Sequence, residues 1–377
     1  MNDIETKVKD FEPVNIIGGG IAGLATALAL KTLGIDYNIF EKSSEIKYEN
    51  VGLGISANIF PILEKWKILE ETRKLGTEIQ DFYFVDKDLN YLNSFKIKSP
   101  ALSVNRRLFY QLLNERLDKE KMHLNCIKSI NDFSENEIVI SADGINSVTR
   151  QKYYPNLKIR NSNQILWRGI SEIKLSEKFQ NAYHDFIGGN LRFAIIHTGG
   201  DYYSWYVIKQ KINNEKVTLD KNTLKTFFKN YHPIVNSVID KTKNVYFSEL
   251  LDINPNDRKN LSWFKNKKLM IGDAIHPTTP NMANGACLAM EDAFLLANLL
   301  SKSSLTLEET FEVFQKQRTK KVDRIVVQSW WFGKLFHSKS KVFDYFIKAG
   351  IAITPNFLFD KIYSNVLDKT NVDDSYE

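Results

Sequence analysis

The sequence predicts an α/β protein that joins a parallel-sheet domain to a second domain built mainly of β-strands. Three observations support this prediction. Residues 13–40 have the pattern strand, glycine-rich turn, helix and strand; residues 165–251 contain aromatic runs with alternating polarity; and residues 268–300 have the pattern of a buried strand followed by a long helix. Alternating strands and helices favour a parallel sheet, whereas successive alternating runs favour paired strands without intervening helices.

The opening segment contains a complete β-α-β unit. Pro13–Ile17 is an apolar run typical of a short buried strand, and Tyr37–Phe40 predicts the next strand. The small residues between 24 and 33 predict a helix that ends at Gly34. This order implies a parallel pair of strands with a helix packed across them.

The turn between the first strand and the helix has the spacing G-x-G-x-x-G, filled by Gly18, Gly20 and Gly23. These glycines allow a tight turn, a close approach of backbone to a pyrophosphate, and close packing of helix on strand. Glu41 ends the next strand 18 residues after Gly23, where a carboxylate can accept hydrogen bonds from ribose hydroxyls. The context predicts a Rossmann-type nucleotide site, and a turn kept for packing alone is the alternative.

Further elements follow from periodicity and composition. We expect a glycine-rich loop over Val51–Asn58, an amphipathic helix over Phe60–Leu75 with Trp66 and Leu69 on one face, and a helix over Arg106–Leu117. The later predictions are strands at Leu191–His197 and Tyr202–Ile208, a helix near Leu224–Tyr231, a buried strand entering a loop over Lys268–Asp273, and a helix over Gly285–Leu300. The nucleotide domain is therefore discontinuous, and the tail from Thr310 onward is predicted to be mostly helical.

Composition excludes several other classes of protein. The 51 Lys and Arg against 45 Asp and Glu give a net charge of only +6 without a basic patch or reader motif, so no nucleic-acid partner is expected. Cys126 and Cys287 form no CxxC pair, and the two rule out a disulfide framework. No run of eighteen apolar residues and no secretory leader is present, so we expect a cytoplasmic protein without a membrane span. No metal site is expected either.

Two further motifs complete the pattern: Ser141-Ala-Asp-Gly-Ile-Asn-Ser147 with Arg150, and Ile271-Gly-Asp-Ala-Ile-His-Pro277 followed by Pro280, Gly285, Glu291 and Asp292. With the first motif, they resemble the single-component flavoprotein aromatic hydroxylases, which share the para-hydroxybenzoate hydroxylase-like fold. That family includes zeaxanthin epoxidase, FAD-dependent urate hydroxylase and the tetracycline-inactivating monooxygenases. The resemblance spans roughly residues 13–330.

The resemblance implies a Rossmann-type, GR2-like FAD-binding domain (residues 1–160 plus 255–330), a mixed β-sheet substrate domain (161–254) and a C-terminal helical segment (331–377). It implies FAD as cofactor and NAD(P)H and O2 as co-substrates. Oxygen would pass from a flavin C4a-hydroperoxide to a small aromatic or polycyclic, unsaturated molecule by hydroxylation or epoxidation. An FAD-dependent reductase or dehydrogenase without oxygenation, and a catalytically silenced flavoprotein, remain as alternatives. We expect a monomer or homodimer.

The resemblance also assigns roles to single residues. Asp273 matches the carboxylate that holds the ribityl chain of FAD, Asp143 the aspartate of a motif shared by FAD and NAD(P)H binding, and Arg106 an arginine near the FAD phosphates. The cofactor-binding residues expected are Gly18, Gly20, Ile21, Ala22, Gly23, Glu41, Lys42, Gly54, Arg106, Asp143, Asp273, Pro280, Gly285 and Ala286. Arg168 and Tyr206 are the candidate substrate contacts. Trp167 and Tyr206 fit a pocket wall and a packed core equally well, and no side-chain nucleophile is expected.

The sequence departs from the family pattern in three places. Ala283-Asn284-Gly285 replaces a common Gly-Gln-Gly, which costs about 1 kcal/mol if position 283 has a positive φ. Cys287 is expected to be a packed small residue, and His276 either a satisfied loop histidine or a catalytic one. Only eleven residues separate Cys126 from Ile138, which removes a peripheral hairpin. In the tail, Trp330, Trp331, Phe332 and Phe336 favour a helix that caps both domains over one that touches a membrane.

Overall fold

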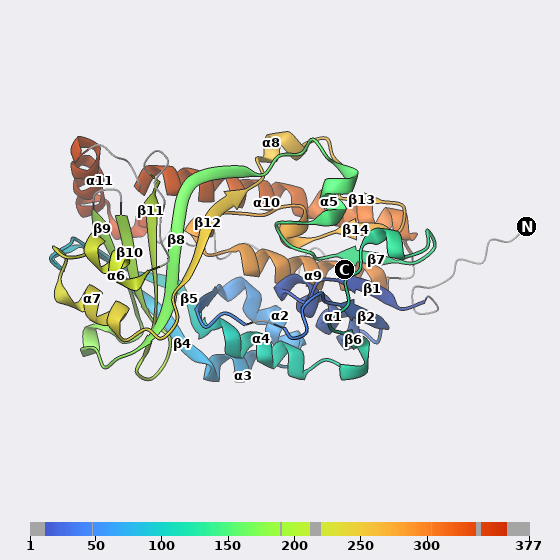
Figure 1. Cartoon of the computed structure of the whole chain (residues 1–377), viewed down its shortest axis with the longest axis horizontal. Helices are drawn as coiled ribbons and strands as arrows, with labels where there is room; N and C mark the ends of the chain where they lie inside the picture. Colours follow the sequence, from blue (N-terminus) through green and yellow to red (C-terminus); the bar gives the residue numbers. More distant parts are fainter. Residues whose placement is uncertain are drawn as a thin grey trace, which may run out of the picture.

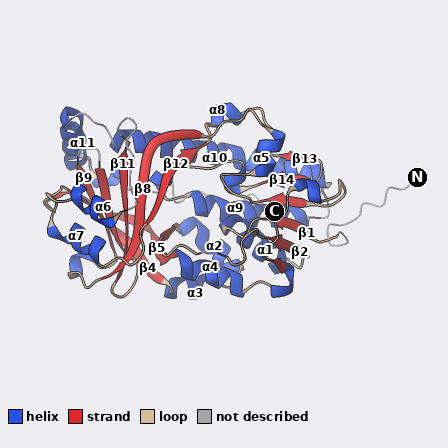
Figure 2. Ribbon diagram, viewed as in Figure 1, coloured by secondary structure: helices blue, strands red, loops and turns tan. Residues whose placement is uncertain are grey.

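The computed structural model describes residues 12–46, 48–188, 191–211, 220–302, 304–336 and 341–359. Two sheets lie side by side, each flanked by helices, and one long helix crosses the top of both (Figures 1 and 2). The polar residues 1–11 and the end of the predicted C-terminal segment, 360–377, lie outside the described residues.

The first sheet has six strands, five of them parallel, in the order β13-β14-β7-β1-β2-β6. Its strands are β13 (Phe264–Lys265), β14 (Lys268–Met270), β7 (Val139–Ser141), β1 (Val14–Ile17), β2 (Tyr37–Phe40) and β6 (Met122–His123). The four residues of β1 are all buried, and Val14 pairs with Tyr37 in β2. The predicted β-α-β opening is therefore confirmed, and Gly34 has the positive φ (73°) expected after the helix.

The second sheet has eight strands in the order β12-β8-β11-β10-β9-β4-β5-β3, and only the β4–β9 pair is parallel. Its strands are β12 (Tyr246–Asp252), β8 (Arg160–Glu172), β11 (Tyr202–Gln210), β10 (Leu191–His197), β9 (Ala182–Gly188), β4 (Gly76–Val85), β5 (Tyr91–Asn105) and β3 (Gly52–Ile55). One face buries Trp167, Phe193 and Trp205 beneath the outer helices α6 (Lys221–Phe227) and α7 (Pro233–Asp240). Trp167 is thus a core aromatic.

The helices are α1 (Ile21–Thr32), α2 (Phe60–Lys65), α3 (Leu69–Lys74), α4 (Arg106–Glu115), α5 (Val148–Tyr153), α6 (Lys221–Phe227), α7 (Pro233–Asp240), α8 (Pro255–Arg258), α9 (Gly285–Ser301), α10 (Leu307–Phe336) and α11 (Lys341–Ile353). Short 3-10 turns occur at η2 (Ala57–Ile59), η3 (Lys119–Lys121), η4 (Ile130–Asp132), η5 (Glu177–Phe179), η6 (Gly272–Ala274) and η7 (Pro280–Met282). The predicted helices at 106 and 285 are confirmed to within two residues.

Two local predictions were wrong. The loop expected over Val51–Asn58 is strand β3 followed by η2, because Gly52–Ile55 pairs with β5. A Cβ on Gly52 would come within 2.4 Å of the Ser204 hydroxyl, so this glycine permits close packing of strands instead of a flexible loop. The single helix expected over Phe60–Leu75 is two helices, because Lys67 adopts a left-handed conformation (φ 58°) between them.

The second sheet also takes three strands from a region predicted to belong to the first domain. Strands β3, β4 and β5, between residues 52 and 105, complete the sheet that was expected from residues 161–254 alone. The division of the chain into domains stays a prediction. The eight-stranded sheet, however, is not confined to residues 161–254, because it includes β3, β4 and β5.

Helix α10 links the two sheets. At its start Gln315 Oε1 accepts a hydrogen bond of 2.8 Å from Trp263 N, beside the first sheet. Toward its end Gln164 Nε2 of β8 donates to Gly333 O at 2.7 Å, and Trp330 lies 3.4 Å from the Arg160 guanidinium. The capping role expected for the aromatic tail is confirmed for Trp330 (Figure 1).

Candidate active site

The glycine-rich turn requires glycine at two positions. Gly18 has a φ of +108°, and a Cβ there would lie 2.4 Å from Ala142 O. A Cβ on Gly23 would lie 1.9 Å from Gly18 O. At Gly20, by contrast, a Cβ would meet no atom within 4 Å, so open space lies at the start of α1, and Gly20 has no side chain to cap the helix. The backbone N–H groups of the first turn, at Ile21 to Gly23, are thus available to an anion such as a pyrophosphate.

Glu41 lies directly beside this turn. Its Oε2 accepts a hydrogen bond from Gly19 N at 2.7 Å and its Oε1 one from Ser43 N at 2.9 Å. Two backbone donors therefore fix the carboxylate, and each oxygen keeps acceptor capacity for a ribose hydroxyl. The neighbouring Lys42 side chain is exposed.

Asp273 lies in η6, next to the first turn of α1. Gly272 (φ +55°) approaches Ala22 so closely that a Cβ would be 3.0 Å from the Ala22 Cβ, which brings η6 against the first turn of the helix. The Asp273 side chain is exposed, and yet burial raises its pKa, an effect that His276, Arg106 and Arg150 partly oppose. Asp273 is therefore open to solvent on one side although protein atoms surround it on the others.

Arg106, at the start of α4, is close enough to Asp273 for the two charges to interact. Its Nη1 donates to Glu49 Oε2 at 3.1 Å and its Nη2 to Tyr110 OH at 3.0 Å. Arg168 Nη2 on β8 donates to the same Glu49 oxygen at 2.6 Å. Glu49 therefore joins the arginine expected near phosphate to the arginine expected near substrate.

Asp143 and Arg150 secure the backbone around Asp273. Asp143 Oδ2 accepts from Val148 N at 2.9 Å, so this carboxylate caps α5. Arg150, which is 1% exposed, donates to Ala274 O at 2.7 Å and to Asp273 O at 3.2 Å. In this structure Asp143 and Arg150 position the loops of the site.

The early part of α9 lies near η6, because a Cβ on Gly272 would be 3.7 Å from the Ala289 Cβ. Ala283 has a left-handed backbone conformation (φ 50°), so position 283 does have the positive φ at which alanine is less favourable than glycine. Asn284 provides no side-chain hydrogen bond that caps the helix. Pro280 is exposed, and Gly285 and Ala286 are half-buried in the open first turn. A Cβ on Gly54 would be 3.8 Å from the Ala283 Cβ, so β3 borders this helix start.

Cys287 and His276 are both buried in structural positions. Burial raises the pKa of the Cys287 thiol, whose Sγ lies 3.3 Å from the Ser56 hydroxyl, so it stays a protonated packing group as expected. His276 Nε2 lies 2.6 Å from Asp292 Oδ2, and the ring is 1% exposed. A carboxylate, and not the backbone, satisfies this histidine.

A cluster of buried charged residues joins α9 to α10 and to His276, which follows η6. We call it the α9–α10 charge cluster, and its members are His276, Glu291, Asp292, Arg318 and Lys321. Asp292 also accepts from Gly272 N at 2.9 Å, and Glu291 accepts from Asn58 Nδ2 at 2.6 Å. Burial would raise the pKa of Asp292, but His276 and Arg318 outweigh it and lower the pKa to about 2. The cluster thus ties η6, η2, α9 and α10 together.

A second polar cluster lies on the second sheet. We call it the β9–β11 polar cluster, and its members are Tyr183, Asp185, Arg192 and Tyr206. Arg192 Nε donates to both oxygens of Asp185, at 2.9 and 2.7 Å, and Arg192 Nη2 donates to Tyr183 OH at 2.9 Å. The Tyr183 and Tyr206 hydroxyls are hydrogen-bonded to each other. Burial raises the pKa of Tyr206 to about 12, although the side chain keeps part of its surface accessible.

Register places Tyr206 next to Arg168. The two residues are directly paired across β11 and β8, so their side chains lie on the same face of the sheet, opposite the Trp167 core. Arg168 reaches Glu49 and through it Arg106. The predicted substrate contacts are therefore adjacent to each other and linked to the predicted cofactor residues.

Sequence reasoning missed four residues of this arrangement: Glu49, Tyr183, Asp185 and Arg192. The last two could have been noticed as charged residues inside the apolar strands Ala182–Gly188 and Leu191–His197, where a charge is retained only with a partner. Glu49 lies in an irregular segment and gave no such signal.

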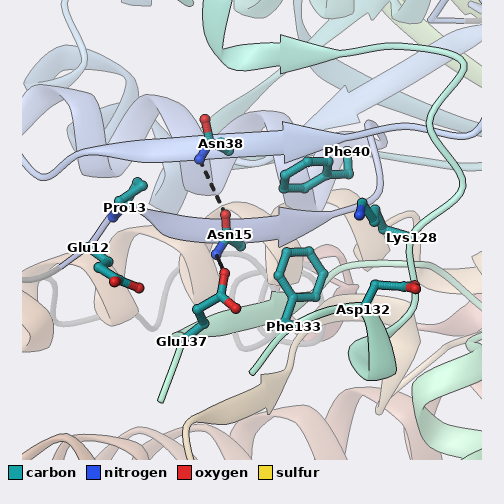
Figure 3. A pocket seen from close by; sticks show the side chains of 9 residues that line it. All are labelled: Glu12, Pro13, Asn15, Asn38, Phe40, Lys128, Asp132, Phe133 and Glu137. Atoms are coloured by element: carbon teal, nitrogen blue, oxygen red, sulfur yellow. Dashed lines mark hydrogen bonds between the residues drawn. The ribbon is translucent and has the colours of Figure 1, made fainter. Parts of the chain in front are cut away.

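A separate pocket of about 490 Å3 opens over strands β1 and β2 of the first sheet, and no predicted site residue lines it (Figure 3). Asn38 Nδ2 donates to Asn15 Oδ1 and Asn15 Nδ2 to Glu137 Oε1, both at 3.3 Å. The segment that follows Cys126 contributes Lys128, Asp132 and Phe133 to its wall and contains η4 where relatives were expected to have a hairpin. The pocket thus lies beside the shortened segment.

Comparison with known proteins identifies the family. A family profile described as an FAD binding domain matches residues 12–115 and 135–328. The 2-heptyl-3-hydroxy-4(1H)-quinolone synthase of Pseudomonas aeruginosa is 26% identical over 348 residues, with 85% of this chain and 89% of the relative covered. The 3-hydroxybenzoate 6-hydroxylase of Polaromonas naphthalenivorans is also 26% identical, with 87% and 88% covered.

Solved structures share the fold. Klebsiella pneumoniae HpxO in complex with FAD and uric acid superposes with a TM-score of 0.84 at 19% identity, covering 94% of this chain and 96% of that one. The tetracycline destructase Tet(51) gives a TM-score of 0.65 at 18% identity, covering 96% and 100%. The predicted combination of a Rossmann-type domain and a mixed-sheet domain is therefore confirmed.

Proposed function

This chain belongs to the FAD-binding-domain family and is an FAD-dependent monooxygenase, and from this premise we propose that it uses NAD(P)H and O2 to hydroxylate or epoxidise a small, electron-rich aromatic or unsaturated molecule. When bound, the flavin supplies the oxygen-transfer chemistry, and the protein supplies binding, orientation and shielding from water.

One observation carries the assignment of the site. The first turn of α1, η6 with Asp273, and the early part of α9 meet at Gly272, where a Cβ would contact both Ala22 and Ala289. Two helix N-termini without side-chain caps and one desolvated carboxylate thus lie close together. Anionic groups are stabilised at helix N-termini, which suits the pyrophosphate at α1 and the electron-rich edge of a reduced flavin at α9.

The cofactor roles proposed for individual residues follow from this geometry. Gly18, Gly20 and Gly23 admit the pyrophosphate, and Glu41 accepts from the ribose. Asp273 accepts from the ribityl chain, and Arg106 attracts the phosphates as a guanidinium fork. The remaining residues proposed to line the cofactor are Ile21, Ala22, Lys42, Gly54, Asp143, Pro280, Gly285 and Ala286.

The substrate role is proposed for Arg168 and Tyr206. Because burial keeps Tyr206 protonated at neutral pH, its hydroxyl can donate to or accept from a phenolic, enolic or carbonyl oxygen of a ring. The hydrogen bond between the Tyr206 and Tyr183 hydroxyls fixes the direction of the Tyr206 hydroxyl, because Tyr183 is itself held by Arg192 and Asp185. Arg168 adds positive charge on the same face and favours substrates that carry partial or full negative charge.

The proposal is tested by visible absorption spectroscopy of the purified chain under anaerobic NADH or NADPH. A panel of 3-hydroxybenzoate, urate, 6-hydroxynicotinate and 4(1H)-quinolones follows the named relatives. We expect bound oxidised flavin whose bleaching one panel class accelerates, followed by recovery on adding O2. Bleaching that no ring compound accelerates, and that yields no oxygenated product, would favour a reductase.

A further inference from the structure

One carboxylate lies between a residue proposed to bind the cofactor and a residue proposed to bind the substrate. Glu49 Oε2 accepts a hydrogen bond of 2.6 Å from Arg168 Nη2 on β8 and one of 3.1 Å from Arg106 Nη1 at the start of α4. The three side chains are only partly exposed, at 39% for Glu49, 27% for Arg168 and 29% for Arg106. A half-buried carboxylate that two guanidinium groups share neutralises part of the positive charge of both.

The main chain beside Glu49 is attached to α4 and to β12. Val51 O accepts a hydrogen bond of 2.8 Å from Arg106 N, and Asn50 N donates one of 3.2 Å to Tyr246 OH. These bonds lie one and two residues after Glu49, so they restrict the positions that its side chain can reach. The carboxylate is therefore held in place before any ligand arrives, and its pairing needs little further ordering.

Arg168 has the middle place in a row of three side chains on the second sheet. Tyr206 of β11 and Tyr246 of β12 are directly paired with Arg168, one on each side, so all three lie on the face opposite the Trp167 core. Burial raises the pKa of Tyr206 to about 12, so its hydroxyl is an uncharged hydrogen-bonding group at neutral pH. Arg168 thus supplies the formal charge of this row, and Glu49 opposes that charge.

The charges around Arg168 nearly balance. Arg106 and Arg168 contribute two positive charges and Glu49 one negative charge, which leaves one positive charge, and Arg106 also interacts with the carboxyl group of Asp273. A ring compound with an ionised carboxylate could bind Arg168 only by displacing Glu49 or by lying next to it, and both weaken binding. A neutral ring oxygen can instead accept from another guanidinium N–H group while Glu49 stays in place.

We propose that Glu49 is a specificity-determining residue, which holds Arg168 in a neutral pair and so favours uncharged ring compounds over those that carry an ionised carboxylate. This role rests on the proposed function and narrows its substrate class. Among the compounds that Arg168 attracts, Glu49 retains those whose ring oxygen has partial negative charge and disfavours those with a full negative charge.

The test compares two ligands of nearly equal shape, 3-hydroxybenzamide and 3-hydroxybenzoate. Each is titrated into the full-length, FAD-loaded protein, and binding is followed by the visible absorbance of the flavin. We expect the wild-type protein to bind the amide about tenfold more tightly, and Glu49→Gln to shift this ratio about tenfold toward the carboxylate. Glu78→Gln is the matched control, because Glu78 is 34% exposed and pairs with Arg73 at 2.8 Å.

A second measurement does not depend on the identity of the ring. Iodide and acrylamide both quench the fluorescence of bound flavin, but only iodide responds to charge near the flavin. We expect the ratio of iodide to acrylamide quenching to rise about twofold in Glu49→Gln and to stay at the wild-type value in Glu78→Gln. In an Arg168→Gln background, Glu49→Gln should raise the ratio no further, because Glu49 acts through Arg168.

The proposal is overturned if the wild-type protein binds the carboxylate as tightly as the amide, or if Glu49→Gln leaves the ligand ratio unchanged. Where neither ligand perturbs the flavin, the quenching ratio decides in the same way. Oxygenated product is measured on the same samples. Product from a protein without charge selectivity would leave the proposed function standing and remove the role of Glu49, whereas a shifted ratio without any product would do the reverse.

Discussion

The two buried polar clusters resemble each other in composition but differ in what they contact. In the α9–α10 charge cluster, both carboxylates are occupied by side chains and backbone of neighbouring elements, and Asp292 alone is contacted by His276, Arg318 and Gly272 N. In the β9–β11 polar cluster, the ion pair of Asp185 and Arg192 leads through Tyr183 to Tyr206, which keeps accessible surface. One cluster's bonds end inside the protein, whereas the last member of the other keeps accessible surface. This difference fits the roles that we propose for them, a scaffold and a recognition group.

The largest effect should come from breaking the scaffold. In Arg318→Met, Asp292 and Glu291 lose their shared cation and remain buried, which should cost about 3–5 kcal/mol in the free energy of unfolding. Urea unfolding followed by circular dichroism, together with the flavin retained after gel filtration, measures this loss. Arg324→Met, at an exposed position of the same helix, is the control. A loss below 1 kcal/mol would show that the cluster is not a scaffold.

The opposite face of β9 offers a contrast in pH dependence. The His184 ring is stacked on the rings of Phe179 (centroids 4.0 Å apart) and Tyr83. Among the described residues neither nitrogen of the His184 ring has a hydrogen-bond partner, and burial lowers the pKa of His184 to about 3. Because the unfolded chain binds this proton below about pH 6.5, folding stability should fall by about 1.4 kcal/mol per pH unit as the pH drops from there toward 3.

His184→Phe should remove this component of the acid slope in urea unfolding measured between pH 6.5 and 4. His123→Phe, at an exposed histidine, should keep it. An unchanged slope in His184→Phe would mean that His184 is not buried in its neutral form.

The recognition group should respond more modestly. Tyr206→Phe removes one hydroxyl from the accessible end of the β9–β11 polar cluster, and we expect about a tenfold rise in substrate KM with FAD retention unchanged. Tyr203→Phe is the matched control, because Tyr203 lies on the same strand but faces the opposite, buried side. Equal effects of the two substitutions would contradict a role of Tyr206 in substrate binding.

The smallest effect is expected at the start of α9. Ala283 holds a left-handed conformation, so Ala283→Gly should relieve strain and raise the free energy of unfolding by up to about 1 kcal/mol. Thermal unfolding of the FAD-loaded protein measures the change. A clear loss of stability would mean that the alanine methyl group makes a contact worth more than the strain.

The sequence predicted the local geometry of the glycine-rich turn far better than the contacts made across the second sheet. The glycine-rich turn and Glu41 belong to one β-α-β unit, so their spacing predicts that they lie together, as they do. Their roles, and the role that the resemblance assigns to Asp273, stay predictions. Tyr206 and Arg168 become neighbours only through strand register, and the Asp185–Arg192 pair forms across a hairpin. The same limit explains the missed strands β3 to β5, because pairing partners of Gly52–Ile55 lie some fifty residues away at Leu102–Asn105.

The most direct test of the central claim is turnover under 18O2 with NAD(P)H and the panel compound that best accelerates flavin reduction, followed by mass spectrometry of the product. A monooxygenase incorporates one labelled atom, so we predict a product that carries a single 18O. A product without label, or one that takes its oxygen from labelled water, would contradict assignment of this chain as an FAD-dependent monooxygenase.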